Sequence, residues 1–248
     1  MTFRLDGMDE AAVASCCVAP RVALFSEVAS TMDEAHRLAV AGAPSGTVVI
    51  ADRQLAGRGR LGRTWTSEAG LGLWMTILNR QVERTGLDVL SLRIGLRLAT
   101  VFDQFSDAPV TLKWPNDLLV ERRKLAGILV EARWRESAIE WAAIGVGVNI
   151  VAPADQPFAT GLRAGTRRIE LLRAVVGQVN EACMVPGEFT ADELVAFSAR
   201  DAARGQQLTE PARGRAGGVT RNGALIVETS AGTELFRRGS LVFASEEG

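Results

Sequence analysis

The segment from Gln54 to Trp65 is the feature that most limits how this chain can fold. It places three glycines and three arginines between two apolar runs, 47–51 and 71–78, which predict buried strands. Glycine lets a backbone bend and approach a ligand closely, and arginine carries a permanent charge on a planar fork that suits carboxylate and phosphate. The segment therefore predicts a strand–loop–strand unit whose loop binds anionic ligands.

Two known phosphate-binding motifs match this segment in part. Gly57, Gly59 and Gly62 have the G-x-G-x-x-G spacing of dinucleotide-binding loops, and residues 57–64 approach the P-loop pattern with arginine in place of its lysine. Both motifs need a helix directly after the loop, whose N-terminus holds the phosphate. Residues 65–72 are a poor helix start, which disfavours both interpretations. A solvated arginine–glycine segment that binds RNA remains an alternative.

Composition excludes several classes of protein. The chain has 28 Lys and Arg against 29 Asp and Glu, so its net charge of −1 provides no general attraction to nucleic acid or anionic membrane. Cys16, Cys17 and Cys183 are odd in number and lack C-x-x-C spacing, which argues against a disulfide framework and a thiolate zinc site. His36 is the single histidine, so a histidine-rich metal centre is excluded, and we expect it exposed or half-exposed on a helix.

Localisation follows from what the sequence does not contain. No apolar run approaches the roughly 18 residues of a membrane span, and the first ten residues lack the charge pattern of a signal peptide. Together with the unpaired cysteines, this predicts a cytoplasmic protein with no membrane association.

Hydrophobic periodicity predicts an α+β domain over residues 1–200, with a mixed or antiparallel sheet flanked by helices. The expected strands are 22–25, 47–51, 71–78, 110–113, 117–121, 124–134 and 139–149, and the expected helices are 31–41, 88–105, 168–183 and 190–199. Ser30 and Thr31 cap the first of these helices, and Gly42 ends it. We expect residues 1–20 to be loosely ordered or to form a short strand.

A small β-barrel is expected over residues 201–248. Its predicted strands are 206–209, 216–220, 224–228 and 234–237. Asn222-Gly223 predicts a type I′ hairpin turn, because both central positions of that turn need positive φ.

Two lysine-containing segments suggest a reactive site. Residues 113–117 (Lys-Trp-Pro-Asn-Asp) break a strand and offer a cation, an amide and a carboxylate, as a magnesium–phosphate complex requires. Lys124 begins an apolar strand in which Gly127 indicates close approach to a ligand. Residues 145–149 (Gly-Val-Gly-Val-Asn) form a second strand with glycines on one face, suggesting a slot for a flat substrate. An ordinary β-turn and a surface lysine are the alternatives.

Taken together, these segments resemble the biotin–protein ligase family. The motifs that carry the resemblance, in the family's order, are Ser30-Thr31, GRGRLGRTW within 54–65, KWPND at 113–117, KLAGILVE at 124–131 and GVGVN at 145–149. The resemblance covers residues 20–240 and implies a catalytic fold similar to class II aminoacyl-tRNA synthetases. It further implies that the C-terminal β segment is an SH3-like barrel.

The resemblance also implies the reaction and its participants. Biotin would react with ATP to form biotinyl-5′-AMP, and a lysine of a biotin-acceptor domain, the biotin carboxyl carrier protein of a carboxylase, would then receive the biotin. Biotin or adenylate contacts are implied for Ser30, Thr31, Met32, Gln54, Gly57, Arg58, Gly59, Arg60, Trp65, Lys124 and Gly127. The ATP–magnesium side is implied for Lys113, Asn116, Asp117 and Asn149, with Mg²⁺ held through the phosphates and no direct protein ligand assigned. Lys124 and Arg60 are the expected catalytic residues.

Two departures from the family pattern affect what is expected. Met32 stands where many relatives have asparagine, so a polar side-chain contact is lost there. About 20 residues precede the catalytic pattern, too few for the DNA-binding helix-turn-helix of longer members, so we expect no DNA partner. The protein is expected to be a monomer or a homodimer.

Two competing functions remain open from the sequence. Lipoate–protein ligase and octanoyl transferase are similar in core fold but lack this arginine–glycine signature. A non-enzymatic RNA- or biotin-binding module is the second competitor, although it would have no use for the segment 113–117 or for Lys124.

Overall fold

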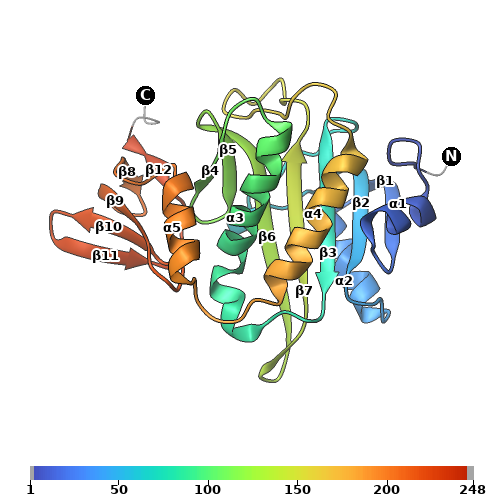
Figure 1. The fold of residues 1–248 in the computed structure, drawn as a ribbon, viewed down its shortest axis with the longest axis horizontal. Helices are drawn as coiled ribbons and strands as arrows, with labels where there is room; N and C mark the ends of the chain where they lie inside the picture. Colours follow the sequence, from blue (N-terminus) through green and yellow to red (C-terminus); the bar gives the residue numbers. More distant parts are fainter. Residues whose placement is uncertain (1–2, 245–248) are drawn as a thin grey trace.

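Two β-sheets organise the chain, as a computed structural model shows for residues 3–244 (Figure 1). Residues 1–2 and 245–248, the outer ends of the predicted loose N-terminus and of the predicted C-terminal domain, lie outside the described residues. Helices lie on both faces of the larger sheet, which confirms the mixed α+β class. None of the described helices is long and apolar enough to cross a membrane.

The larger sheet has seven strands in the order β1-β2-β3-β7-β6-β5-β4. These strands are β1 Val22–Val28, β2 Thr47–Gln54, β3 Gly72–Asn79, β4 Val110–Lys113, β5 Asp117–Val120, β6 Arg123–Arg135 and β7 Ala138–Asn149. β1 pairs parallel with β2, and every other neighbouring pair is antiparallel. All seven strands were predicted from apolar runs, with boundaries that differ by a few residues.

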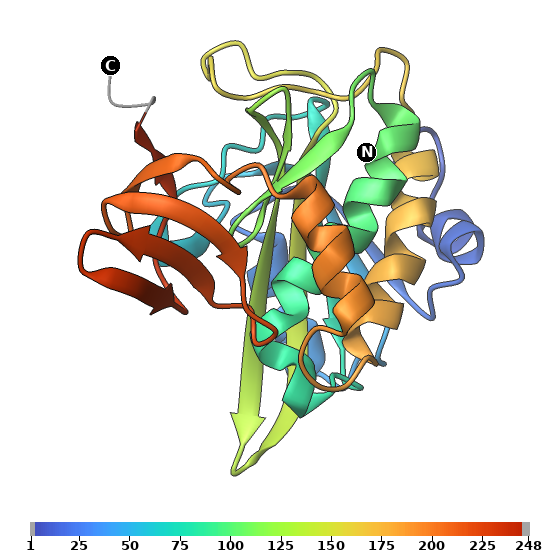
Figure 2. The ribbon, with the colours of Figure 1, turned by 60° about the vertical axis from the view of Figure 1, so that its left-hand side comes forward.

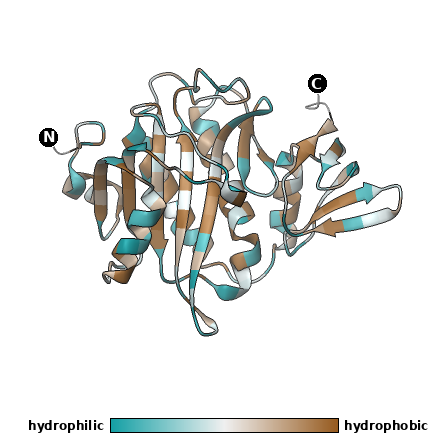
Figure 3. Cartoon of the chain, turned by 180° about the vertical axis from the view of Figure 1, so that it is seen from behind, coloured by the Kyte–Doolittle hydropathy of each residue, from teal (hydrophilic) through white to brown (hydrophobic). Residues whose placement is uncertain are grey.

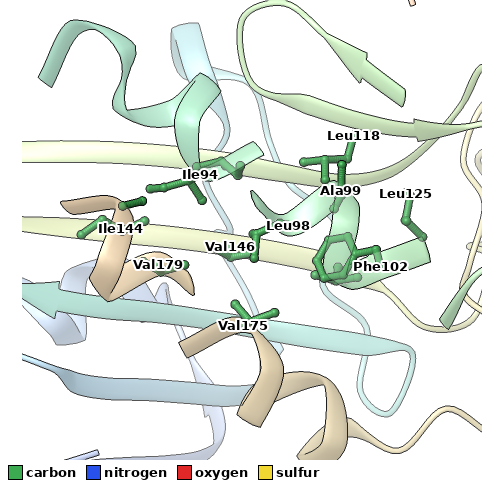
Figure 4. Packing of buried hydrophobic residues seen from close by; sticks show 14 of the residues in the cluster. Ile94, Leu98, Ala99, Phe102, Leu118, Leu125, Ile144, Val146, Val175 and Val179 are labelled. Carbon is green, nitrogen blue, oxygen red and sulfur yellow. The ribbon is translucent and has the colours of Figure 1, made fainter. Parts of the chain in front are cut away.

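One face of this sheet is covered by α3 (Leu90–Phe102) and α4 (Arg168–Cys183) (Figures 1 and 2). Their apolar stripes pack onto alternate residues of the central strands, because successive strand side chains point to opposite faces. Figure 4 shows this core, in which Leu98 and Phe102 of α3 lie near Val146 of β7, all at most 1% exposed. The predicted helices 88–105 and 168–183 are therefore confirmed.

The opposite face carries α2 (Thr31–Val40), which covers only part of it (Figure 3). Ser30 caps this helix by accepting a hydrogen bond from the Met32 backbone N–H at 3.2 Å. Met32 and Leu38 pack with Trp141 of β7 in a second, smaller apolar cluster. The helix therefore leaves the neighbouring part of this sheet face to other segments.

The prediction for residues 1–20 was wrong, because α1 (Glu10–Cys17) is a helix. The Asp9 carboxylate accepts a hydrogen bond from the Ala12 N–H at 3.0 Å and caps it. Val13 and Cys17 are buried by this helix. Only these two of its side chains are buried, so the short segment showed no helical periodicity.

The C-terminal sheet is antiparallel, with the order β11-β10-β9-β8-β12, and α5 (Ala191–Arg200) precedes it. Its strands are β8 Gln207–Glu210, β9 Gly214–Val219, β10 Leu225–Thr229, β11 Gly232–Phe236 and β12 Val242–Phe243. The predicted hairpin between β9 and β10 is confirmed, but the type I′ turn is wrong, because Gly223 and not Asn222 has positive φ. Among the described strands β11 and β12 are edges, so the sheet is open rather than a closed barrel.

Candidate active site

The arginine–glycine loop folds back on itself between β2 and β3. The Trp65 N–H donates to the Gly57 carbonyl at 2.8 Å, and the Gly59 N–H donates to the Arg63 carbonyl at 2.7 Å. A Cβ at position 57 would lie 2.4 Å from the Trp65 carbonyl oxygen, so only glycine fits there. The loop leads into a strand and not a helix, which removes the dinucleotide-binding and P-loop interpretations.

The loop forms one wall of a pocket on the sheet face that α2 leaves open. Its charged lining comes from the loop, from the end of β4, from the start of β5 and from the start of β6. Five cations and one carboxylate line it, namely Arg58, Arg60, Arg63, Lys113, Lys124 and Asp117. Such an excess of positive charge attracts polyanionic reactants and reduces the repulsion between them.

Glycines on the central strands shape the floor of this pocket. A Cβ at Gly147 would lie 2.7 Å from Nε1 of Trp65, and one at Gly127 would lie 2.9 Å from Cζ3 of the same ring. The absence of side chains at these two positions therefore lets the indole lie against the sheet. Trp65 Nε1 is buried and has no hydrogen-bond partner among the described residues. This donor is available to an acceptor group of a ligand.

Lys124 and Asp117 meet at the edge of the same slot. Lys124 Nζ lies 2.8 Å from Asp117 Oδ1 and 5.0 Å from the centroid of the Trp65 ring. The two residues come from neighbouring strands, since Asp117 pairs in register with Gly127 of β6. The Asn116 side-chain amide donates to the Ile128 carbonyl at 2.8 Å and holds the turn against β6.

Gln54, a half-buried polar residue in the pocket lining, forms several hydrogen bonds. Gln54 Oε1 accepts from the backbone N–H of Thr31 at 2.8 Å and from its hydroxyl at 3.0 Å. The Gln54 amide donates to Ser67 Oγ at 2.8 Å. The hydroxyls of Thr31 and Thr76 lie 2.9 Å apart, and Ser30 beside them is 1% exposed. These fixed hydroxyls and amide can position the polar ring of a small ligand.

Arg58 is attached to the rest of the protein by two carboxylates. Its Nη2 lies 2.8 Å from Oδ1 of Asp33 on α2 and 3.5 Å from Oε2 of Glu131 on β6. The same Glu131 oxygen lies 3.0 Å from His36 Nε2, and Trp141 Nε1 donates to His36 Nδ1 at 2.9 Å. His36 is half-buried, in agreement with the prediction, yet it belongs to a network that no sequence motif indicated.

Burial and neighbouring charges shift the pKa of two groups here. Burial lowers the pKa of the Arg60 guanidinium, while the negative charge of Asp117 opposes that change. The pKa of Glu131 lies below its usual value because His36 hydrogen-bonds to the carboxylate and Arg58 adds positive charge, against the opposing effect of burial. Glu131 is therefore ionised at neutral pH, which suits it to hold Arg58.

Most of the site residues predicted from the sequence line this one pocket. They are Ser30, Thr31, Met32, Gln54, Arg58, Gly59, Arg60, Trp65, Lys113, Asn116, Asp117, Lys124 and Gly127. Gly57 and Asn149 lie outside its lining. Gly57 acts through the loop backbone, and Asn149, which is 4% exposed, donates to the Lys124 carbonyl at 3.3 Å. Both therefore support lining residues rather than face the pocket.

Sequence reasoning missed two kinds of lining residue. Thr76 is a polar residue within the buried strand β3, and that anomaly was visible in the sequence. Ser240, which lies between β11 and β12, accepts a hydrogen bond from Arg63 Nη2 at 2.7 Å. It joins the C-terminal sheet to the loop across 177 positions, and no local signal could have predicted this contact.

Comparison with known families supports a common ancestry for this site. Residues 24–149 match the model of the Biotin/lipoate A/B protein ligase family. The bifunctional ligase/repressor BirA of Bacillus spizizenii is 32% identical over 225 residues, which cover 83% of this chain and 68% of that protein. The biotin–[acetyl-CoA-carboxylase] ligase of Paracoccus denitrificans is 28% identical, over 89% of this chain and 99% of that protein.

Solved structures have the same fold. A biotin protein ligase from Aquifex aeolicus in complex with biotin and ATP superimposes with a TM-score of 0.69, at 24% identity over 90% of this chain and 97% of that one. The Leishmania major biotin protein ligase in complex with biotin gives a TM-score of 0.60, at 26% identity over 89% of this chain and 99% of that one.

Proposed function

Because this chain belongs to the biotin/lipoate A/B protein ligase family, we propose that it activates biotin with ATP and transfers it to a biotin-acceptor protein. The observation that carries this proposal is the pocket itself, where five cations and one carboxylate surround a glycine-floored slot. The curated relatives are named as ligases of biotin, which favours biotin over lipoate as the substrate.

The reaction has two steps in which every atom is accounted for. In the first, a carboxylate oxygen of biotin attacks the α-phosphorus of ATP, the bond to the β-phosphate oxygen breaks, and pyrophosphate leaves. In the second, the amine of an acceptor lysine attacks the acyl carbon of biotinyl-5′-AMP, forming an amide and releasing AMP and a proton. The first step brings two anions together, and in the second step negative charge moves onto the departing AMP phosphate, so fixed positive charge serves both steps.

Each pocket residue has a role in the reaction that follows from its position. Lys124, at the edge of the slot, neutralises the biotin carboxylate and the phosphoryl oxygens as charge shifts between them. Arg60 holds the adenylate, and Gln54 with Thr31 positions the biotin ring. Trp65 lies over the glycine floor and orders the loop on the adenine side.

Lys113 completes the phosphate side of the pocket. Its ammonium lies 4.7 Å from the centroid of Phe243, so the C-terminal sheet supports it. We assign that sheet, within residues 201–248, to the SH3-like domain of the family, and residues 1–200 to the catalytic domain. The segment around Ser240 then contributes to the active site directly.

Magnesium fits this site as a companion of the nucleotide. No group of three or more His, Cys, Asp or Glu in residues 3–244 could hold a metal ion by itself. Asp117 is the single carboxylate among the described lining residues, and Asn116 lies next to it. Mg²⁺ would therefore be held mainly by the phosphates, with this pair beside it, and would supply charge neutralisation there.

The acceptor is a biotin-acceptor domain of a carboxylase, and the reaction takes place in the cytoplasm. The free thiols of Cys16, Cys17 and Cys183 agree with a reducing compartment. The other binding partners are small molecules, ATP and biotin.

The test is a reconstituted reaction with the purified chain. ATP, Mg²⁺, biotin and a biotin-acceptor domain are combined, pyrophosphate release is followed, and the acceptor is weighed by mass spectrometry. The expected result is biotin-dependent pyrophosphate release and an acceptor heavier by one biotinyl group. A parallel reaction with lipoate and its acceptor should give neither product. Preference for lipoate would replace biotin as the substrate, and no pyrophosphate with either acid would support the non-enzymatic binding alternative.

A further inference from the structure

A network of two hydrogen bonds and one ion pair connects the buried core to the arginine–glycine loop. It runs from Trp141 through His36 and Glu131 to Arg58, with contacts of 2.9, 3.0 and 3.5 Å. These residues come from β7, α2, β6 and the loop, so four separate segments take part. No binding or catalytic motif recognised in the sequence accounts for His36 or Trp141.

Trp141, at one end of this network, is held in the core. Trp141 is 5% exposed and packs in the apolar cluster beneath α2. An indole N–H can only donate, so His36 Nδ1 must accept, and the ring proton of the neutral imidazole lies on Nε2. The His36 Nε2–H then donates to Glu131, which fixes the orientation of that carboxylate.

The other end is held by two carboxylates. Arg58 lies between Gly57 and Gly59, which add no side-chain packing, and its own side chain is 41% exposed. Its shorter ion pair, 2.8 Å to Asp33, involves a carboxylate that is 53% exposed, whereas Glu131, at 3.5 Å, is 36% exposed and is also bound to His36. Glu131 is therefore the partner of Arg58 that is itself held by the core.

We propose that His36, Glu131 and Trp141 are positioning residues that hold Arg58 in the orientation that binds biotin. This inference rests on the proposed function, because it gives Arg58 a substrate to contact. None of the three positioning residues is among the described residues that line the pocket, so each acts through Arg58. Substitution of any of these three residues should therefore weaken biotin binding and leave the rate of the chemical step unchanged.

Steady-state kinetics test this division. His36→Leu should raise the KM for biotin about tenfold, because Glu131 loses its charge-assisted hydrogen bond, while kcat and the KM for ATP change by less than about twofold. His36→Gln should restore the KM for biotin, since the glutamine amide can donate to Glu131. Arg37→Gln is the matched control, because Arg37 lies on the same helix, is 61% exposed and pairs with Glu34 rather than with this network.

A double-mutant cycle separates positioning from a loss of stability. In an Arg58→Gln background, His36→Leu should raise the KM for biotin no further, because the residue through which it acts is already gone. An equal rise in both backgrounds would overturn the proposal, as would an unchanged KM for biotin in His36→Leu alone.

Nuclear magnetic resonance tests the network without any substrate. His36 is the single histidine, so its ring nitrogens give one unambiguous pair of signals. Nε2 should be protonated and Nδ1 should not, and Arg58→Gln should shift both signals. Arg53→Gln, which removes an arginine paired with Glu27 away from this network, should leave them unchanged.

The pyrophosphate assay and the His36 spectrum test the two proposals separately. A wild-type protein without biotin-dependent pyrophosphate release would defeat the proposed function, whatever the His36 spectrum shows. A proton on Nδ1, or His36 signals that ignore Arg58→Gln, would defeat the positioning network even if the enzyme biotinylates its acceptor.

Discussion

Nζ of Lys124 and Oδ1 of Asp117 lie 2.8 Å apart, at the point where the predicted turn 113–117 and the start of β6 meet. The carboxylate holds the ammonium over the Trp65 ring, at the rim of the glycine-floored slot. This pair places the one acidic side chain among the described lining residues against the cation that we propose contacts both reactants. The position of Lys124 is therefore set before any phosphate arrives.

Removal of Lys124 should stop activation without unfolding the protein. We expect Lys124→Ala to slow pyrophosphate release by about 10²–10³, since one well-placed cation contributes about that factor. Arg123→Ala is the control, because the neighbouring Arg123 is exposed and its ion pair is with the exposed Glu121. Equal rates for Lys124→Ala and wild type would contradict the role of Lys124, and circular dichroism should show both variants folded.

Removal of Arg60 should loosen the hold on the intermediate. Arg60→Gly is expected to release biotinyl-5′-AMP into solution, where it labels lysines of any protein present. The reason is that Arg60 lines the pocket, is partly buried there beside Asp117 and, in the proposed function, holds the adenylate. Mass spectrometry of an unrelated protein added to the reaction measures the stray labelling. Biotin found on the acceptor lysine alone would argue against this retention.

A methyl group at Gly147 should displace Trp65 from the floor of the slot. Its Cβ would lie 2.7 Å from the indole nitrogen, a distance that forces the ring to move. Gly147→Ala should therefore weaken biotin binding and shift the tryptophan fluorescence. Gly177→Ala is the matched control, because its Cβ has open space in α4, and it should stabilise that helix by about 1 kcal/mol. Unchanged biotin affinity in Gly147→Ala would contradict this account of the floor.

A buried ion pair should stabilise the junction between α3 and α5. Arg93 is fully buried, and its Nε and Nη2 contact the two oxygens of Glu193 at 2.6 and 3.1 Å. Glu193→Ala should lower the free energy of unfolding by about 3 kcal/mol, since it leaves the buried guanidinium without its counter-charge. Urea denaturation measures this. Asp192→Ala, an exposed neighbour in the same turn, should change it by less than about 0.5 kcal/mol.

Much of the architecture could be predicted because it depends on local patterns. The seven strands of the main sheet and helices α2 to α5 all follow from apolar periodicity and from caps such as Ser30. The α-helix and the strand that sequence reasoning missed have no such pattern, since α1 buries only Val13 and Cys17 and β12 has only two residues. Burial of a short segment depends on what it packs against, which the segment itself does not reveal.

The sequence and the tertiary structure determined different properties of the site. The sequence determined which groups are present, because glycines beside arginines and a lysine before an apolar strand are local facts. Only the tertiary structure decided that Arg58 meets Glu131, that Trp65 lies on Gly147, and that Ser240 reaches Arg63. These contacts join segments far apart in the chain, and they depend on strand register and on the docking of the C-terminal sheet. No local pattern of residues specifies either of these, because both are set by the packing of the whole chain.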